Sequence, residues 1–180
     1  MAATYDAGRI YKFASEVEGA DINKLQDAII ATQDAFRICF FAKDVKGADI
    51  NKLQDSIIAT KDAEWIYKFA RYIEGADIAK LSEGMANTKD AYGIYSFAKN
   101  VKEADINKLQ DAIIATKNAD YIYNFAKDIE GADIEKLRVA VIATGDEHYI
   151  KLFTKEVLNN NLDLEGMLAE MAGQEDNVQV

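Results

Sequence analysis

The sequence lacks proline and has very few of the residues that build metal or disulfide sites. Its 180 residues include no proline, one cysteine and one histidine. The single Cys39 excludes an internal disulfide framework, and one histidine beside one cysteine leaves too few soft ligands for a structural zinc site. Glycine and aspartate must therefore supply the turn chemistry that proline often provides.

Basic residues and long apolar runs are also scarce. The chain has 31 acidic and 21 basic side chains, a net charge of −10, which excludes a basic nucleic-acid-binding arm. With 49% hydrophobic residues it is too apolar for a disordered acidic tail. No apolar run approaches the roughly 18 residues of a membrane span, and no basic-then-apolar leader precedes the first repeat. We therefore expect a soluble, cytoplasmic protein.

A repeat of 28 residues runs through the chain. The segment GADINKLQDAIIAT at residues 19–32 recurs nearly intact, and a polar residue anchors each unit. A fixed period of this size indicates stacked supersecondary units, since each unit exposes an apolar face that only its neighbours can cover. The six anchors are Asp6, Asp34, Asp62, Asp90, Asn118 and Asp146.

Each unit contains two apolar stripes with helical spacing. The fifth, eighth, ninth and twelfth positions are apolar, which places them on one side of an α-helix. This first helix should begin after the anchor Asp and end at a glycine in a left-handed C′ conformation, namely Gly19, Gly47, Gly75 or Gly131. A second helix should begin after Asp21, Asp49, Asp77, Asp105 or Asp133. The short turns between them predict antiparallel helix pairs.

The predicted fold is all-α, a right-handed α-solenoid of about six two-helix repeats. Residues 1–172 should form a single domain with repeats starting near 6, 34, 62, 90, 118 and 146, and residues 173–180 a flexible C-terminal tail. Over about residues 6–172 the chain resembles α-solenoids of the HEAT, tetratricopeptide and ankyrin kind. The 28-residue period is shorter than in those families, and the tetratricopeptide Trp, Gly and Pro markers are missing. The resemblance implies scaffolding and protein binding, and it carries over no catalytic residue.

The two ends and the third repeat depart from the pattern. Gly8, Arg9 and Lys12 replace aromatic residues on the first helix, which predicts a polar N-terminal cap. Residues 162–171 carry an altered leucine and methionine pattern, which predicts a C-terminal cap. In the third repeat, Ser82 and Gly84 depart from the pattern of the second helix. Either the sequence of this repeat has drifted within a stable array, or the helix forms a local bend or pocket.

Aromatic residues are concentrated on the outward side of the first helices. The third, fourth, seventh and eleventh positions give 4 × 6 = 24 places, and a 10% aromatic content would put two or three rings there. The excess favours a partner-binding surface, because aromatic residues concentrate at binding hot spots. The alternative is that fourth-position rings pack between adjacent first helices. The seven predicted partner-binding residues are Phe36, Phe40, Trp65, Tyr72, Tyr92, Tyr121 and Tyr149.

No spacing typical of a catalytic or cofactor site occurs, so we expect no enzyme activity, no cofactor and no bound metal. Cys39 is expected to be a buried structural thiol, and His148 a surface residue. Four tyrosines at the sixth position are expected to pack beside the core with their hydroxyls in water. They are Tyr11, Tyr67, Tyr95 and Tyr123. On the second helices, Lys24 should pair with Asp27, and later repeats should do the same.

The sequence thus predicts a non-catalytic protein-binding module, an inhibitor or adaptor that docks an aromatic, acidic surface on a partner protein. One specific version is a phage-type antagonist of a bacterial defence nuclease, because nucleic-acid channels are basic and attract acidic proteins. We expect no direct nucleic-acid binding, no membrane contact and no small-molecule substrate.

Two alternatives stay open. Acidic residues recur at the eleventh position, so the surface could imitate a nucleic-acid backbone, although cations at the tenth position oppose it. Those acids are Glu16, Asp44, Asp128 and Glu156. The same cations, with the aromatic residues, suit repeat-wise recognition of single-stranded RNA. The net charge of −10 argues against this second alternative.

Overall fold

The computed structural model describes residues 6–158 of the chain, and this part is all-α with no strand. The first helices of the repeats are α1 (Ala7–Glu16), α3 (Ala35–Asp44), α5 (Ala63–Tyr72), α7 (Ala91–Asn100), α9 (Ala119–Asp128) and α11 (Glu147–Leu152). The second helices are α2 (Ile22–Ala31), α4 (Ile50–Thr60), α6 (Ile78–Ala86), α8 (Ile106–Ala115) and α10 (Ile134–Ala143). A π-helical segment, η1 (Phe153–Val157), directly follows α11.

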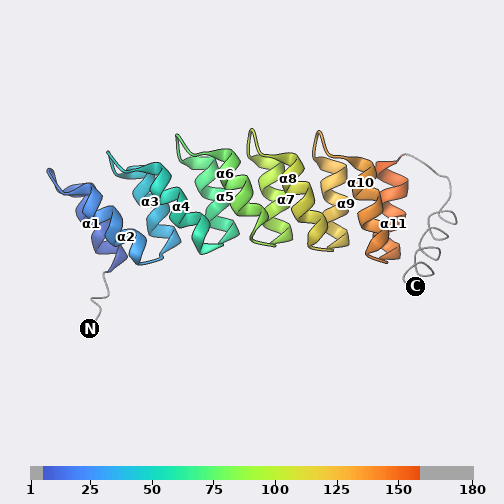
Figure 1. Ribbon diagram of the computed structural model, residues 1–180, viewed down its shortest axis with the longest axis horizontal. Helices are drawn as coiled ribbons and strands as arrows, with labels where there is room; N and C mark the ends of the chain where they lie inside the picture. The colour runs from blue at the N-terminus through green and yellow to red at the C-terminus, as the bar shows by residue number, and fades with distance from the viewer. Residues whose placement is uncertain (1–5, 159–180) are drawn as a thin grey trace, which may run out of the picture.

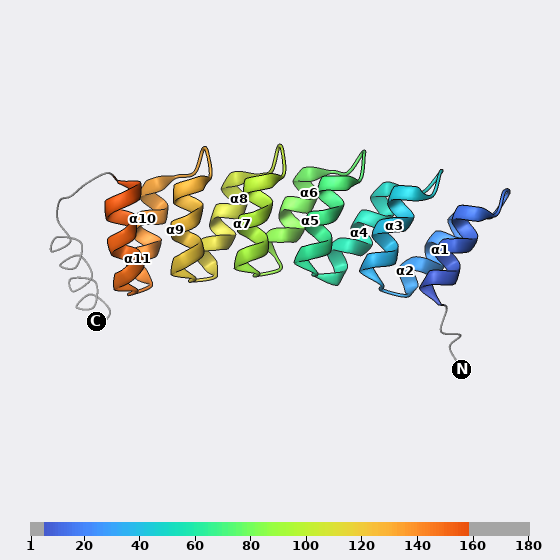
Figure 2. The same cartoon turned by 180° about the vertical axis from the view of Figure 1, so that it is seen from behind.

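The helices form one row that extends from the N-terminal to the C-terminal end of the described chain (Figures 1 and 2). The first helices α1 to α9 each pack against their own second helix, and neighbouring first helices pack against each other along the whole described row. This regular packing confirms the predicted helical-repeat solenoid. The right-handed superhelix stays a prediction. The predicted C-terminal cap and the tail at 173–180 lie outside the described residues.

The polar anchors are the N-caps of the first helices, as their position in the repeat predicts. In α3, for example, Asp34 accepts a hydrogen bond from the backbone N–H of Arg37 at 3.0 Å. Such a bond satisfies one of the amide groups that have no partner within the helix. Asp49 caps α4 in the same way, through the N–H of Lys52 at 3.1 Å. The sequence therefore gives the starts of both helix types correctly.

The predicted ends of the first helices are wrong. Helix α3 ends at Asp44, and its C-cap Val45 is already extended with ψ 112°. Gly47 has a φ of +84°, but it lies two residues beyond the C-cap, in the turn that leads to α4. Left-handed residues do follow the second helices, as with Lys61 at φ 56° after α4. The glycine therefore shapes the turn between the helices, and it is not the C′ residue of the first helix.

The apolar stripes form one main core, and Ile142 and Ile150 form a small separate cluster. The eighth-position phenylalanines are fully buried in all described repeats but the first, and they are Phe41, Phe69, Phe97, Phe125 and Phe153. The first repeat differs, because Phe13 is 51% exposed and Val17 is 41% exposed. The prediction of a polar N-terminal cap is therefore only half right. The outward positions of α1 are polar, yet the end face of the row is apolar.

Buried glutamines link the second helices of the first, second and fourth repeats to the repeat that follows. Gln26 accepts a hydrogen bond from the backbone N–H of Asp49 at 2.8 Å, and Gln54 accepts one from Asp77 at 2.8 Å. Gln110 accepts the equivalent bond from Asp133 at 2.7 Å. These bonds hold the start of each following second helix in place, 23 residues along the chain.

The lysines of the second helices also connect repeats, which corrects the expected pairing within one helix. Lys52 pairs with Asp27 of the preceding repeat, and Lys108 pairs with Glu83 at 3.2 Å. Because the interaction crosses the junction, each lysine lies 25 residues after its carboxylate. The predicted pair of Lys24 with Asp27 does not form.

The irregular second helix of the third repeat brings its neighbours closer. Ser82 takes the place of the buried glutamine and still accepts a hydrogen bond from the N–H of Asp105 at 3.1 Å. Serine is shorter than glutamine, so the start of α8 must lie nearer to α6 at this junction. On the other side, a Cβ atom at Gly84 would lie 2.8 Å from the side chain of Ile58. The departures in this helix therefore permit close helix packing at the middle of the row.

Candidate partner-binding surface

Three junctions between first helices are closed by a hydrogen bond that we call the tyrosine–carboxylate bridge. In it, the sixth-position tyrosine of one repeat donates its hydroxyl to the eleventh-position carboxylate of the next repeat. Tyr11 donates to Asp44 at 2.7 Å, and Tyr95 donates to Asp128. Tyr123 donates to Glu156 at 2.7 Å. The two later bridges also contain a tenth-position lysine.

Lysine completes the bridges at the α7–α9 and α9–α11 junctions. Lys99 Nζ lies 2.7 Å from Asp128 Oδ2, and Lys127 Nζ lies 2.6 Å from Glu156 Oε2. These bonds lower the pKa of Asp128 and of Glu156 below their ordinary values. Burial is the largest reason that the pKa of Tyr95 is raised, so its hydroxyl keeps its proton. Asp128 and Glu156 are thus charged but already engaged, and they do not contribute free negative charges to a ladder.

The two junctions in the middle of the row lack this bridge. Between α3 and α5, the sixth position is Cys39 and the eleventh position of the next repeat is Tyr72. Between α5 and α7, the sixth position is Tyr67 and the eleventh position of the next repeat is Asn100. Asn100 donates instead to the backbone oxygen of Ser96 in its own helix, at 2.9 Å. The central junctions therefore have no tyrosine–carboxylate contact to close them.

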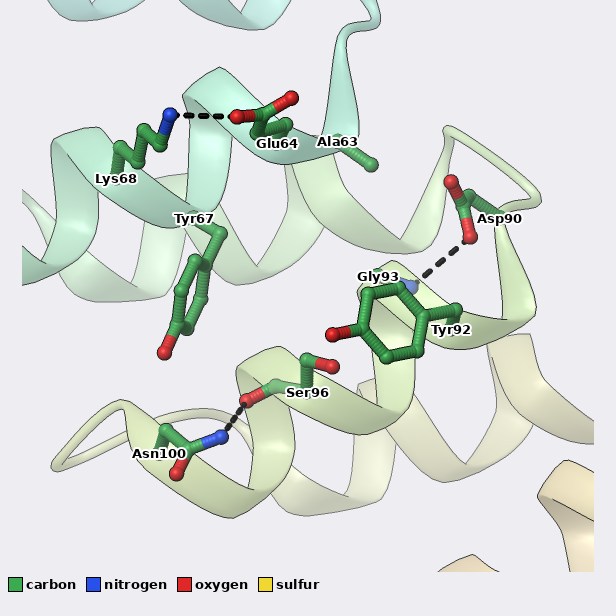
Figure 3. Close-up of a pocket in the computed structure, with 9 residues that line it drawn as sticks. All are labelled: Ala63, Glu64, Tyr67, Lys68, Asp90, Tyr92, Gly93, Ser96 and Asn100. Carbon is green, nitrogen blue, oxygen red and sulfur yellow. Dashed lines mark hydrogen bonds and ion pairs between the residues drawn. The ribbon is translucent and has the colours of Figure 1, made fainter.

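A cavity lies at each of these two junctions. The cavity between α3 and α5 is about 300 Å³, and both Cys39 and Tyr72 line it. The cavity between α5 and α7 is about 460 Å³, and both Tyr67 and Asn100 line it (Figure 3). The residues that replace the bridge are thus the residues that border the open space.

Four of the seven predicted partner-binding residues surround the first of these cavities. We call Phe36, Phe40, Trp65 and Tyr72 the central aromatic surface. The ring of Phe36 lies 4.6 Å from that of Phe40 and 5.4 Å from that of Trp65. Tyr72 is 59% exposed and Phe36 is 41% exposed, while Phe40 and Trp65 are half-buried. These side chains, from α3 and α5, form a contiguous surface that is open to solvent.

Cations lie over the rings of this surface, which the sequence had led us to expect to be acidic. Lys68 Nζ lies 4.1 Å from the centroid of the Trp65 ring, and Arg37 lies 4.9 Å from that of Phe36. At 5.9 Å, Arg71 is near the Tyr72 ring, and Lys43 is 6.0 Å from Phe40. Within residues 6–158, Lys43 and Arg71 pair with no carboxylate. The protein is acidic as a whole, but its central aromatic surface is cationic.

The other three predicted residues lie outside this surface. Tyr92 is 64% exposed on α7, and its ring centroid is 6.2 Å from that of Tyr121. Both Tyr121 and Tyr149 are half-buried and pack against the core. Tyr149 also lies 6.0 Å from the ring of Tyr123. The placement of Tyr121 and Tyr149 matches the alternative in which fourth-position rings pack between first helices, and Trp65, which also packs against the core, matches it in part.

Reactive side chains are few at these cavities. Cys39 is buried, as the sequence predicts, and burial raises the pKa of its thiol to about 11, so the thiol stays protonated at neutral pH. His148 is exposed, with its ring 5.0 Å from that of Tyr149. In the described part of the chain, no group of three His, Cys, Asp or Glu side chains could hold a metal ion.

Sequence reasoning missed the cations and the bridges, although a signal for both was present. The eleventh position is acidic in four repeats and changes to Tyr72 and Asn100 only in the middle two. This interruption coincides with the open junctions. The tenth-position cations across these open junctions, Lys43 of the second repeat and Arg71 of the third, therefore lack carboxylates like those that engage Lys99 and Lys127.

Comparison with known proteins finds no family model, no curated protein and no solved structure that matches this chain. Among residues 6–158, no helix is long and apolar enough to cross a membrane. The assignment of a function therefore depends on the surface itself.

Proposed function

We propose that the protein is a non-catalytic binding module, an inhibitor or adaptor that docks the central aromatic surface on a partner protein. The single observation that carries the proposal is the difference between junctions. Among the first-helix junctions within residues 6–158, only α3–α5 and α5–α7 lack the tyrosine–carboxylate bridge, and these same junctions combine cavities with exposed rings and unpaired cations.

The composition of the surface is suited to tight contact. Tryptophan, tyrosine and arginine dominate binding hot spots, and here Trp65, Tyr72 and Arg71 lie together on α5. The rings stand on helices whose opposite side is fully buried, as at Ile66 and Phe69. A rigid support lowers the entropy lost on binding, because the side chains are already near their bound positions.

The proposal includes two further statements on context. We assign the interaction to the cytoplasm, where a buried free thiol such as Cys39 stays reduced. A bacterial defence nuclease is one specific candidate partner, and it rests on the net charge of −10 alone. The cationic character of the central aromatic surface favours an acidic contact region on the partner instead.

Paired substitutions test the proposal. Trp65→Ala with Tyr72→Ala should abolish capture of the partner from the native host, while helicity by circular dichroism stays nearly unchanged. Tyr121→Ala with Tyr149→Ala is the matched control, because it also removes two rings from first helices but lies outside the central surface. Equal capture by a folded Trp65/Tyr72 variant and by the native protein would move the site elsewhere.

Single-stranded RNA is the second candidate ligand, and the cations over Phe36 and Trp65 favour it. Stacking on aromatic rings and Arg or Lys contacts to the backbone are the usual means of binding single strands. The net charge of −10 opposes the approach of a polyanion. A titration of labelled single-stranded RNA at low salt that stays flat would exclude this candidate.

Imitation of a nucleic-acid backbone receives little support from the surface. Asp44, Asp128 and Glu156 are held by tyrosine hydroxyls, so they are not displayed as free charges. If the imitation nevertheless operates, duplex DNA should compete for the partner, and salt should weaken the complex steeply.

A further inference from the structure

The α5–α7 junction keeps two of the three parts of a tyrosine–carboxylate bridge. Tyr67 occupies the sixth position and Arg71 the tenth, and Arg71 Nη1 donates to the Tyr67 hydroxyl oxygen at 3.1 Å. At the α7–α9 and α9–α11 junctions, the equivalent tyrosine and lysine both bind a carboxylate. Only the carboxylate is missing here, because the eleventh position is Asn100 and its side chain bonds within its own helix.

The cavity of about 460 Å³ borders Tyr67 and Asn100, and Arg71 lies next to it through its bond to the Tyr67 hydroxyl. Tyr67 lines it from α5, and Ser96 and Asn100 line it from α7. Figure 3 shows the Tyr67 ring extending from α5 towards the end of α7 that carries Ser96 and Asn100. The fourth position of α7 is Gly93, which also lines the cavity, whereas Trp65, Tyr121 and Tyr149 fill that position in other repeats. Gly93 itself permits close packing of α7 on α5, since a Cβ atom there would lie 2.7 Å from the Cβ of Ala63. The room for a side chain from another molecule therefore lies beside Tyr67 and Asn100.

The two acidic residues that border the cavity already bind other groups of the chain. Glu64 pairs with Lys68 at 2.5 Å, and Asp90 caps α7 through the N–H of Gly93 at 2.9 Å. Asp90 also lies at the opposite end of α7 from Asn100 (Figure 3). In contrast, the guanidinium of Arg71 is exposed and, within residues 6–158, makes no ion pair. The side of the cavity near Tyr67 is therefore a site for an anionic group.

We propose that this site binds the carboxylate of an Asp or Glu side chain from the partner protein, held by the Tyr67 hydroxyl and the Arg71 guanidinium. This inference rests on the proposed function and names the chemistry of one anchoring residue. A carboxylate is favoured over a phosphate because the same chain builds this arrangement with carboxylates at its other junctions. A single carboxylate also meets less repulsion than a polyanion from a protein with a net charge of −10.

A model ligand tests the site without the partner. N-acetylglutamate amide would be titrated into the labelled protein, and the Arg71 Nε–Hε and Tyr67 ring resonances followed by NMR at constant ionic strength. We expect a saturable shift at these groups. N-acetylglutamine amide has the same size without the charge, and its affinity should be at least tenfold lower.

Three variants locate the binding. Arg71→Gln removes the cation, and Asn100→Asp supplies the missing carboxylate from within the chain, so both should lose the glutamate response. Lys99→Gln is the matched control, because it removes a cation from a junction that is already bridged, and it should keep the response. Asn100→Asp is informative even if Arg71→Gln destabilises the fold, because we expect it to close the junction and to raise the melting temperature.

The outcomes separate this inference from the proposed function. Equal binding of the glutamine compound, or an undiminished response in Asn100→Asp, overturns the carboxylate site. A larger saturable shift with inorganic phosphate at the same concentration overturns it in favour of a phosphate ligand. If the glutamate response is found but the Trp65/Tyr72 variant still captures the partner, the site stands and the proposed docking surface fails. If the Trp65/Tyr72 variant loses the partner but no glutamate response is found, the docking surface stands and only the carboxylate site is rejected.

Discussion

The C-terminal junctions and the central junctions of this solenoid are built on the same scaffold but differ on one surface. At α7–α9 and α9–α11, tyrosine, lysine and carboxylate bind one another across the junction. At α3–α5 and α5–α7, the carboxylate is gone, and rings, cations and cavities remain. The difference teaches that neighbouring repeats can lack bonds to each other on one surface while their buried stripe stays unchanged.

The largest expected effect tests whether the two regions share the same core. Phe69→Ala in the central region and Phe125→Ala in the bridged region should each cost about 3 to 5 kcal/mol of unfolding free energy, because both rings are fully buried. Phe13→Ala should cost less than about 1 kcal/mol, since this ring is already half in water. Chemical denaturation measures all three. A clearly smaller loss for Phe69→Ala would mean that the central region is loosely packed.

The next effect concerns the bonds that link second helices. Gln110→Ala leaves the N–H of Asp133 without its partner, and we expect a loss of about 1 to 2 kcal/mol. The exposed Asn107 on the same helix provides the control, and Asn107→Ala should change the stability little. Equal losses for the two variants would show that water replaces the glutamine. Ser82→Ala tests the same bond at the central junction.

A third prediction tests the bridge through its pH dependence. The pKa of Asp128 is lowered mainly by its bond to Lys99, so the bridge stabilises the fold above the ordinary carboxyl value of about 3.8. This contribution should disappear as the pH falls through the lowered pKa. Asp128→Asn should therefore cost about 1 kcal/mol or less at pH 7, and this cost should shrink as the pH falls below the ordinary carboxyl value. Melting temperatures of both proteins from pH 2 to 7 measure it, and parallel curves would contradict it.

The smallest expected effect lies in the turn after α7. Glu103 has a φ of +63°, where the equivalent turns carry glycine, as at Gly75 with +79°. A side chain in this conformation is strained, so Glu103→Gly should raise the unfolding free energy by about 0.5 to 1 kcal/mol. Gly75→Ala should lower it by a similar amount. A loss of stability on Glu103→Gly would show that the Glu103 side chain makes a compensating contact.

The sequence predicted the scaffold well because its signals are local. The Asp34 cap and the Ile66–Phe69 spacing act within one helix, so their meaning does not depend on other repeats. The ends of the first helices were missed because Gly47 has the expected left-handed backbone but in the turn. Gln26 was missed because a polar residue on a helix is normally exposed, and its burial depends on the position of the next repeat.

The candidate surface could be predicted only in part for the same reason. Phe36 and Tyr72 are open to solvent as expected, because the rotation of a helix follows from its own stripe. The partners of Tyr95 and Lys99, in contrast, lie 33 and 29 residues away, and the offset between stacked helices decides which side chains meet. The cationic character of the central surface follows from that offset, and composition alone suggested the opposite sign.

The exposed Phe13 leaves apolar surface uncovered at the N-terminal end of the described row. Its ring occupies the same place as the phenylalanines that lie buried in later repeats, and the interior junctions show which helix type packs against them. An added helix with the DINKLQDAIIAT pattern, fused ahead of Asp6, should settle on this end as it does inside the array. The architecture can therefore be lengthened by design at that side, in steps of 28 residues, without altering the surface at its middle.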